Sequence, residues 1–242
     1  NYWANAPDGH ETSRFFNDHI AEAVTKNPKR FIGIGTVPLQ DIDLAIKEMW
    51  RCVNELKMPG LEIGSNINGK NLSDPSFFPF YDAAEKMSCA LFIHPWEMMG
   101  SDQLNKYWLP WLVGMPAETA RAICSLIFGG VMEKFPKLRF AFAHGGGSFP
   151  YTIGRIKHGF DVRPDLVATD NTISPEKYIG KFWVDSLVHD KKAFQFLVDV
   201  MGTDKICLGS DYPFPLGESV PGQLIEEMAF EKVIQENLFF KN

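Results

Sequence analysis

The stretch ALFIHPWEMM, residues 90–99, has the pattern of a buried β-strand that ends in a polar residue. Ala90 to Ile93 are apolar, His94 follows them directly, and Pro95 cannot donate the next hydrogen bond of a strand. A single histidine in this position is typical of a core side chain that has found a hydrogen bond. A functional role requires that other strands of the chain end in the same way.

Five further short apolar runs share this strand pattern and alternate with longer amphipathic segments. The runs are RFIGIGTVPL (30–39), GLEIG (60–64), RFAFAHGGG (139–147), FWVDSL (182–187) and ICLGSDYP (206–213). Strands that are separated by helices form βαβ units with parallel strands. No repeat, low-complexity tract or linker interrupts the pattern, so we expect a single domain over residues 1–242.

Three of the intervening segments carry apolar residues at helical spacing. They are DIDLAIKEMWRCVNELK (41–57), PAETARAICSLIFGGVMEKF (116–135) and KKAFQFLVDVMG (191–202). Six β/α units are visible in all, whereas a (β/α)8 barrel has eight. The sequence therefore predicts a TIM barrel that lacks its first one to two strands, with NYWAN (1–5) as a candidate for the tail of one more strand.

Three of the strand ends carry side chains that bind metals well. His94, His144 and Asp211 each follow an apolar run directly, and each precedes a sequence that turns the chain. The carboxyl ends of barrel strands converge on one face, where barrel enzymes have their active sites. Imidazole and carboxylate suit a borderline divalent ion, for which we expect zinc; three unrelated structural roles are the alternative. Asp185, at the end of FWVD, is a weaker candidate for the same face.

Three glycines, Gly145 to Gly147, follow His144 directly. Glycine permits a tight strand-to-helix turn, and consecutive backbone N–H groups can also cradle an anion. Both interpretations can hold together. Arg155 and Arg163 lie in the next segment, and a guanidinium matches a carboxylate. Either arginine is therefore a candidate for binding an acidic substrate, with a surface ion pair as the alternative.

The composition is that of a globular protein with an acidic balance. The 242 residues are 45% hydrophobic, and a formal net charge of −6 argues against nucleic acid or an anionic membrane surface as the main partner. No apolar run is long enough to span a bilayer, and no signal peptide opens the chain, so we expect a cytoplasmic protein. The first residue is Asn rather than Met, which is consistent with a longer natural chain.

The remaining cysteines, histidines and tryptophans have simpler interpretations. Four widely spaced cysteines predict buried, reduced thiols: Cys52, Cys89, Cys124 and Cys207. Four histidines are expected to be structural or exposed: His10, His19, His158 and His189. Of these, we expect His19 to lie on a helix and His158 in a connection between elements. Three clustered tryptophans favour a pocket wall or an interface: Trp96, Trp108 and Trp111.

Several longer motifs resemble the decarboxylase branch of the amidohydrolase superfamily. They are FPKLRFAFAHGGG (135–147), ICLGSDYPFP (206–215), HPWEM (94–98), KYWLPWLVGMPAETA (106–120) and SFPYTIGRIKHGF (148–160). The resemblance covers nearly the whole chain and weakens only in the last dozen residues. It implies a (β/α)8 barrel of the amidohydrolase type, a zinc-dependent carboxy-lyase that acts on a small dicarboxylate, and a homodimer.

The resemblance also implies roles for individual residues. His94 and Asp211 match two protein ligands of the zinc, and His144 matches the histidine that acts as acid and base on the metal-bound water. Arg155 matches an arginine that reaches into the neighbouring subunit's site to bind a substrate carboxylate. The positions expected to line the pocket are Met98, Trp111, Phe214 and Trp96.

The sequence departs from the family at the first barrel strand. The family carries an HxH pair there that supplies two further zinc ligands, and no HxH occurs in this chain. A second carboxylate-binding arginine is absent as well. Because catalytic zinc sites use three or more protein ligands, we expect this chain alone to bind zinc poorly. The alternatives to a complete enzyme of this kind are another aromatic-acid decarboxylase or lactone hydrolase, and a truncated homologue that serves as a dimerisation partner.

Overall fold

The computed structural model describes residues 2–242. The chain forms two compact units, each assembled from segments that are distant in sequence. The first unit contains Asn1–Glu97 and Ser125–Phe140, and the second contains Met98–Cys124 and Ala141–Asn242. The prediction of one domain over residues 1–242 stays a prediction.

Parallel strands form the centre of the first unit. β1 (Gly60–Gly64) pairs in parallel with β4 (Ala90–His94), and Gly64 lies opposite His94. Their alternate side chains enter the core because successive residues of a strand point to opposite faces. The buried ones are Leu61, Ile63, Leu91 and Ile93. The predictions of strands at 60–64 and 90–95 are confirmed.

The strand predicted over residues 30–39 is mostly wrong. Only Gly35 joins the ladder, through a parallel bridge to Leu61 in which its N–H donates to Gly60 at 3.0 Å. Gly33 and Gly35 weaken a strand because they have no side chain to pack, and Pro38 lacks an N–H donor. The apolar run therefore crosses the unit as extended chain with a single bridge.

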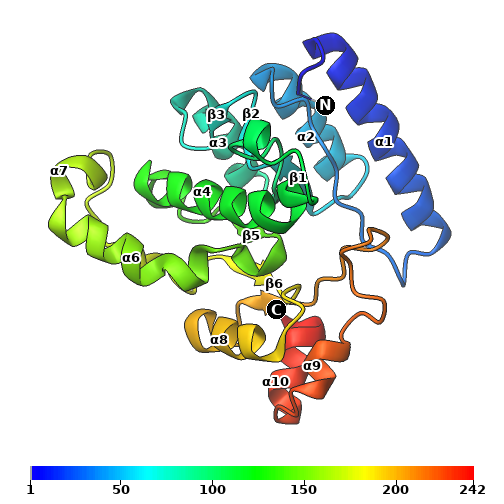
Figure 1. Cartoon of the computed structure of the whole chain (residues 1–242). Helices are drawn as coiled ribbons and strands as arrows, with labels where there is room; N and C mark the ends of the chain where they lie inside the picture. Colours follow the sequence, from blue (N-terminus) through cyan, green and yellow to red (C-terminus); the bar gives the residue numbers. More distant parts are fainter. Residues whose placement is uncertain (1) are drawn as a thin grey trace. The chain divides into compact units, whose positions relative to one another are not determined.

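Helices and two short strands complete the first unit. They are α1 (Ala6–Lys26), α2 (Ile42–Asn54), β2 (Asn66–Ile67), β3 (Lys70–Asn71), η1 (Pro75–Phe77), α3 (Phe78–Lys86) and α5 (Val131–Lys134). α1 lies against α2 (Figure 1), and Asn5 and Asp41 cap the two helices by accepting N–H groups of the first turn. The helix predicted over 41–57 is confirmed. Residues 2–5 contain no strand, so the strand suggested for NYWAN is wrong in its described part, and Asn1 lies outside the described residues.

The helix predicted over residues 116–135 is interrupted at two glycines. α4 (Met115–Phe128) ends before Gly129, and α5 begins after Gly130, whose φ is 68°. A left-handed residue ends a helix, and glycine adopts that conformation without strain. The pattern of apolar residues continues through the break, which is why periodicity alone predicts one helix.

The other parallel strands belong to the second unit, except for Phe140, the first residue of the first of them. β5 (Phe140–Phe142), β6 (Trp183–Asp185) and β7 (Ile206–Cys207) follow one another in that order, with Val184 opposite both Phe142 and Ile206. These strands are predicted by the sequence but are shorter than the apolar runs. His144, Asp185 and Asp211 lie at or just after their carboxyl ends.

The helical elements of the second unit come before, between and after these strands along the chain. They are η2 (Ser101–Gln103), η3 (Pro110–Gly114), η4 (His144–Gly146), α6 (Phe149–Val162), α7 (Pro164–Val167), η5 (Pro175–Tyr178), α8 (Lys191–Met201), α9 (Gln223–Glu227), α10 (Lys232–Glu236) and η6 (Asn237–Lys241). The helix predicted over 191–202 is confirmed, and its C-terminal Gly202 has a φ of 82°. α6 carries His158, so the prediction that this histidine lies in a connection is wrong.

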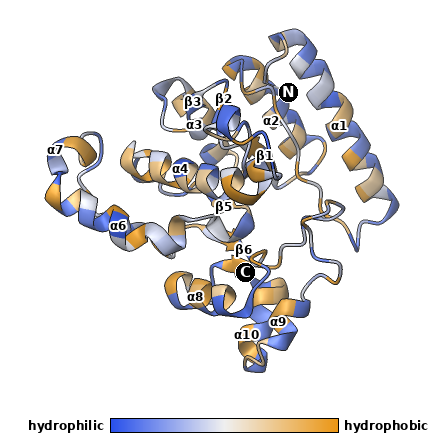
Figure 2. Cartoon of the chain, viewed as in Figure 1, coloured by the Kyte–Doolittle hydropathy of each residue, from blue (hydrophilic) through white to orange (hydrophobic). Residues whose placement is uncertain are grey.

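The surfaces of these helices are mixed, as expected for elements that face both core and solvent. Figure 2 shows hydrophobic and hydrophilic residues along α1 and α8. In α8 the buried side chains are Phe194, Leu197 and Met201, at the spacing of one helix face. Among residues 2–242, no helix combines the length and the apolar composition that crossing a bilayer requires.

The four cysteines are free thiols, as the sequence predicts. Cys52 and Cys89 are buried, and Cys124 and Cys207 are partly buried. Burial raises the pKa of Cys52, Cys89 and Cys124 to about 12, because a thiolate is disfavoured away from water. These thiols are therefore protonated and structural at neutral pH.

Candidate metal centre

His144 and Asp211 lie close together in the second unit. His144 follows β5, Asp211 follows β7, and Nε2 of the first is 3.9 Å from Oδ2 of the second. This distance is too long for a hydrogen bond. Two ligands that each lie about 2.1 Å from a metal ion are about 3–4 Å apart. The pair therefore fits a shared divalent ion, and it equally fits Asp211 as a ligand with His144 as a neighbouring acid or base.

Both residues have a strained backbone. The φ of His144 is 58° and that of Asp211 is 52°, in the left-handed region that favours glycine. For other residues this conformation costs about 1–2 kcal/mol, and it persists where the surroundings fix it. Such strain is concentrated at functional sites, which agrees with the position of both residues at strand ends.

The carboxylate of Asp185 holds the turn that carries His144. Its Oδ2 accepts the N–H of His144 at 2.9 Å, and its Oδ1 accepts the N–H groups of Gly145 at 2.8 Å and Leu187 at 3.0 Å. Burial raises the pKa of Asp185 to about 6, although the three N–H donors favour its charged form. Asp185, the weakest of the four candidates in the sequence, thus accepts three backbone N–H groups around His144.

The three glycines form a tight turn, as one interpretation of the sequence predicts. Gly145, Gly146 and Gly147 have φ values of 60°, 75° and 61°. Gly146 donates its N–H to the carbonyl of Ala143, and Gly147 donates to that of His144. The anion in the backbone cradle is therefore the carboxylate of Asp185 and not a ligand.

His94 lies in the first unit, at the end of β4. A cavity of about 190 Å³ lies beside it, and its other lining residues are Tyr2, Thr36, Glu62, Ile63, Gly64 and Trp96. The N–H of Gly64 donates to the hydroxyl of Tyr2 at 3.0 Å. Burial raises the pKa of Tyr2 to about 12, so the hydroxyl is neutral. Trp96, expected from the sequence to be a pocket wall, lines this cavity.

The sequence pattern gave no functional role to Glu62 or Tyr2. Glu62 is the one charged residue of the run GLEIG, and it is among the residues that line the cavity beside His94. A charge within an otherwise buried strand is the signal that could have identified it. Tyr2 offered no such signal, because its place depends on the path of the chain before α1.

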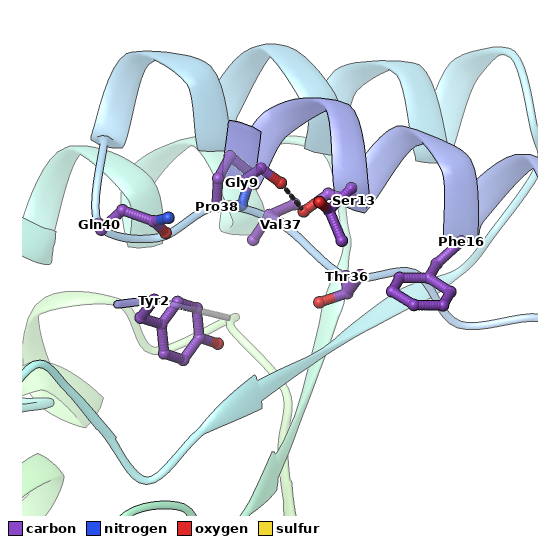
Figure 3. A pocket seen from close by; sticks show the side chains of 9 residues that line it. Tyr2, Gly9, Ser13, Phe16, Thr36, Val37, Pro38 and Gln40 are labelled. Carbon is purple, nitrogen blue, oxygen red and sulfur yellow. Dashed lines mark hydrogen bonds between the residues drawn. The ribbon is translucent and has the colours of Figure 1, made fainter. Parts of the chain in front are cut away.

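A second cavity of about 120 Å³ lies between α1 and residues 36–40 of the first unit. Figure 3 shows Gly9 and Ser13 of α1 above Thr36 and Val37, with the hydroxyl of Ser13 donating to the carbonyl of Gly9. Tyr2 and Thr36 line both cavities, so the two hollows are neighbours.

The other residues expected in a pocket lie in the second unit. Met98 contacts the turn that carries Trp111, because a Cβ on Gly114 would lie 3.0 Å from the Cβ of Met98. The rings of Trp108 and Trp111 are 5.9 Å apart. Phe214 is exposed and follows Asp211 in a turn where its N–H donates to the carbonyl of Asp211. Their roles as substrate contacts stay predictions.

The two arginines differ in their surroundings. Arg155 is exposed on α6. Arg163, at the C-terminus of α6, forms an exposed ion pair with Asp165 at 2.7 Å. For Arg163 the surface ion pair that the sequence left open is the observed arrangement.

The chain thus carries three side chains that could hold a metal ion, namely His94 in the first unit and His144 and Asp211 in the second. Two imidazoles and one carboxylate are donors that borderline divalent ions accept. The donor chemistry predicted from the sequence is therefore present.

Comparison with known proteins identifies the family. Residues 1–240 match the family model described as Amidohydrolase. The chain is 60% identical to a 2-amino-3-carboxymuconate-6-semialdehyde decarboxylase of Dictyostelium discoideum over 242 residues, which is 100% of this chain and 67% of the relative. It is 38% identical to the protein of the same name from Caenorhabditis elegans over 292 aligned residues, 100% of this chain and 73% of that one.

A solved structure shares the fold. The 5-carboxyvanillate decarboxylase of Novosphingobium aromaticivorans, determined with manganese and 4-hydroxy-3-methoxy-5-nitrobenzoic acid, matches with a TM-score of 0.86 and 26% identity. The match covers 98% of this chain and 70% of that one. The chain therefore belongs to the amidohydrolase family and has the fold of its TIM-barrel decarboxylases. Within the family, it is similar over its whole length to the 2-amino-3-carboxymuconate-6-semialdehyde decarboxylases. The predicted fold class and family resemblance are confirmed.

Proposed function

We propose that this protein is a metal-dependent decarboxylase that converts 2-amino-3-carboxymuconate 6-semialdehyde to 2-aminomuconate 6-semialdehyde. This reaction belongs to tryptophan and kynurenine catabolism, where it limits quinolinate formation, and we place the protein in the cytoplasm. The observation that carries the proposal is 60% identity, over every residue of the chain, to a relative of that name.

In this proposal His94 and Asp211 would each supply one ligand to a divalent metal ion, zinc, and His144 would serve as the neighbouring acid and base. The family resemblance expects two further histidine ligands from an HxH pair that this sequence does not contain. The donor types and the 3.9 Å between His144 and Asp211 support this assignment. When bound, the ion supplies Lewis acidity to the site. Manganese accepts the same donors and accompanies the similar 5-carboxyvanillate decarboxylase, so elemental analysis of the purified protein has to identify the metal.

The side chains of the site then have distinct tasks. His144 accepts and returns a proton at Nε2. The substrate gains a proton at the carbon that bears the carboxylate, the bond to that carboxylate breaks, and CO2 leaves. Arg155 from a second copy of the chain binds a substrate carboxylate, which makes the active form a homodimer. We expect substrate contacts from Trp96, Met98, Trp111 and Phe214.

Replacement of His144 tests the proposal. His144→Ala should lower kcat for the muconate semialdehyde by about 100- to 10,000-fold, the range for loss of a general acid or base, while metal content stays near that of the unchanged protein. His19→Ala, which removes an exposed histidine of α1, is the matched control and should leave kcat unchanged. Normal turnover in His144→Ala would refute the role of His144.

A second candidate function is decarboxylation of an aromatic acid, which the match to the 5-carboxyvanillate decarboxylase favours. Incubation of the protein with the muconate semialdehyde, with 5-carboxyvanillate and with a dihydroxybenzoate separates the two, because only the true substrate should release CO2 at a useful rate. No release from any of them, together with no bound metal, would instead support a homologue that acts without catalysis.

A further inference from the structure

We infer that Asp185 is a positioning residue that sets the imidazole of His144 for proton transfer; this inference rests on the proposed function. Asp185 ends β6, between the strands β5 and β7 that lead to His144 and Asp211. Its carboxylate can affect proton transfer without contacting the substrate. It acts through the backbone of His144, which it holds by the hydrogen bond from N–H to Oδ2 at 2.9 Å.

The turn at His144 exposes two successive backbone N–H groups, those of His144 and Gly145, which need a hydrogen-bond acceptor. Successive backbone N–H groups in a turn can point into one concavity and bind an anion there, an arrangement called a nest. His144 and Gly145 form such a nest, and Asp185 fills it with one oxygen for each N–H. Without the carboxylate, the N–H groups of His144 and Gly145 would lose their hydrogen bonds to Oδ2 and Oδ1, which help to stabilise the φ of 58° at His144.

The surroundings leave the carboxylate and the turn little freedom to move. A Cβ on Gly145 would lie 2.5 Å from Val188 Cγ1, and a Cβ on Gly209 would lie 2.7 Å from the Cβ of Asp185. Gly209 precedes Asp211 by two residues. Asp185 is thus packed against the segment that leads to Asp211 while it holds His144, and this fixes the pair at its 3.9 Å separation.

Asp185→Asn separates the positioning role from general stability. The asparagine oxygen can replace Oδ1, which serves Gly145 and Leu187, but the amide nitrogen would then face the N–H of His144. Two donors cannot bond, so the variant loses the His144 contact and keeps the other two. We expect kcat to fall about 10- to 100-fold, as for loss of a supporting hydrogen bond, with KM within about threefold of the unchanged protein.

Asp190→Asn is the matched control. Asp190 also accepts two backbone N–H groups, those of Lys192 and Ala193, and it lies in the same unit at the start of α8. This variant should keep the kcat and KM of the unchanged protein. A loss of activity in Asp190→Asn as large as in Asp185→Asn, or a change confined to KM in Asp185→Asn, would overturn the inference.

Two readouts do not depend on activity. In ¹⁵N-histidine-labelled protein, Asp185→Asn should shift the imidazole signals of His144 more than those of the other five histidines, and Asp190→Asn should shift none of them. In the unchanged protein, hydrogen exchange at the amides of His144 and Gly145 should be slowed at least about 100-fold, although neither lies in an α-helix or a β-strand.

These readouts separate failure of the inference from failure of the proposed function. An unshifted His144 signal in Asp185→Asn, or unprotected amides at both positions, would overturn the role of Asp185. Absence of decarboxylation by the unchanged protein would refute the proposed function alone. The exchange measurement needs no variant, so it decides the question even if Asp185→Asn does not fold.

Discussion

Glu48 illustrates how single residues stabilise the first unit. Its side chain is fully buried on α2. The carboxylate accepts the amide of Asn17 at 2.7 Å and both Nε and Nη2 of Arg51. Nε2 of His10 lies 3.6 Å away. A buried carboxylate is tolerated because each oxygen has a donor, and the same contacts join α1 to α2.

We predict that Glu48→Ala lowers the free energy of unfolding by about 3–5 kcal/mol, because it leaves the Arg51 guanidinium and the Asn17 amide without their buried acceptor. Urea denaturation monitored by circular dichroism measures the change. The control is Asp82→Ala, which removes an exposed ion pair with Lys86 and should change stability by less than about 1 kcal/mol. Equal changes in the free energy of unfolding would show that the buried network stabilises the protein no more than an exposed ion pair does.

At the scale of elements, the turn between β5 and α6 places the candidate site. It reverses the chain within a few residues and positions His144 at the strand end. The pattern of glycines predicts the turn, since each glycine occupies a left-handed position. The partner of the turn, Asp185, comes from a strand about 40 residues later, and sequence pattern alone could not connect them.

We predict that Gly147→Ala destabilises the protein by more than about 1 kcal/mol, because its φ is 61° and a Cβ would overlap the carbonyl oxygen of Pro116. Gly159→Ala is the contrasting substitution. Gly159 lies within α6 with open space around its Cα, so alanine should stabilise the protein by about 0.5–1 kcal/mol. Thermal unfolding of both variants checks the prediction, which fails if their melting temperatures shift in the same direction.

For the whole molecule, the proposed homodimer has a direct test by subunit mixing. If Arg155 serves the neighbouring subunit's site, then His144→Ala and Arg155→Ala proteins are each inactive, and a mixed dimer regains one complete site. Half of the dimers in an equal mixture are mixed, and each has one of two sites intact, so activity should return to about a quarter of the unchanged level. No recovery after confirmed subunit exchange would place Arg155 in its own subunit's site.

The buried thiols predict how stability depends on alkaline pH. The pKa of Cys52, Cys89 and Cys124 is raised to about 12 in the folded protein, against about 8.5 for an unfolded cysteine. Between these values the folded state binds more protons than the unfolded state. The contribution of these thiols to the free energy of unfolding should therefore be constant below about pH 8.5 and fall as pH rises above it.

Denaturant unfolding at pH 7.5 and pH 10 checks this prediction. Cys124→Ala should reduce the loss of stability between the two pH values, because one of the three protonated thiols is gone. A pH dependence that is identical in Cys124→Ala and the unchanged protein would contradict the assignment of this loss to the thiols.

The sequence by itself determined the class of fold and the chemistry of the site. Alternating apolar runs and amphipathic segments specify parallel β/α units, because each element must bury one face. The residues at the strand ends, His94, His144 and Asp211, are local features of the sequence, so their donor chemistry could be predicted without coordinates. The turn at Gly145 to Gly147 could also be predicted from the sequence, because three consecutive glycines are a local feature.

Only the tertiary structure decided which backbone groups these residues meet. It reduced residues 30–39 to a single bridge at Gly35, where burial and pairing depend on neighbouring strands and not on the run itself. It also gave the carboxylate of Asp185 to the N–H groups of His144 and Gly145. Hydrogen bonds between segments that are far apart in the sequence depend on the packing of the strands, and no local pattern encodes that packing.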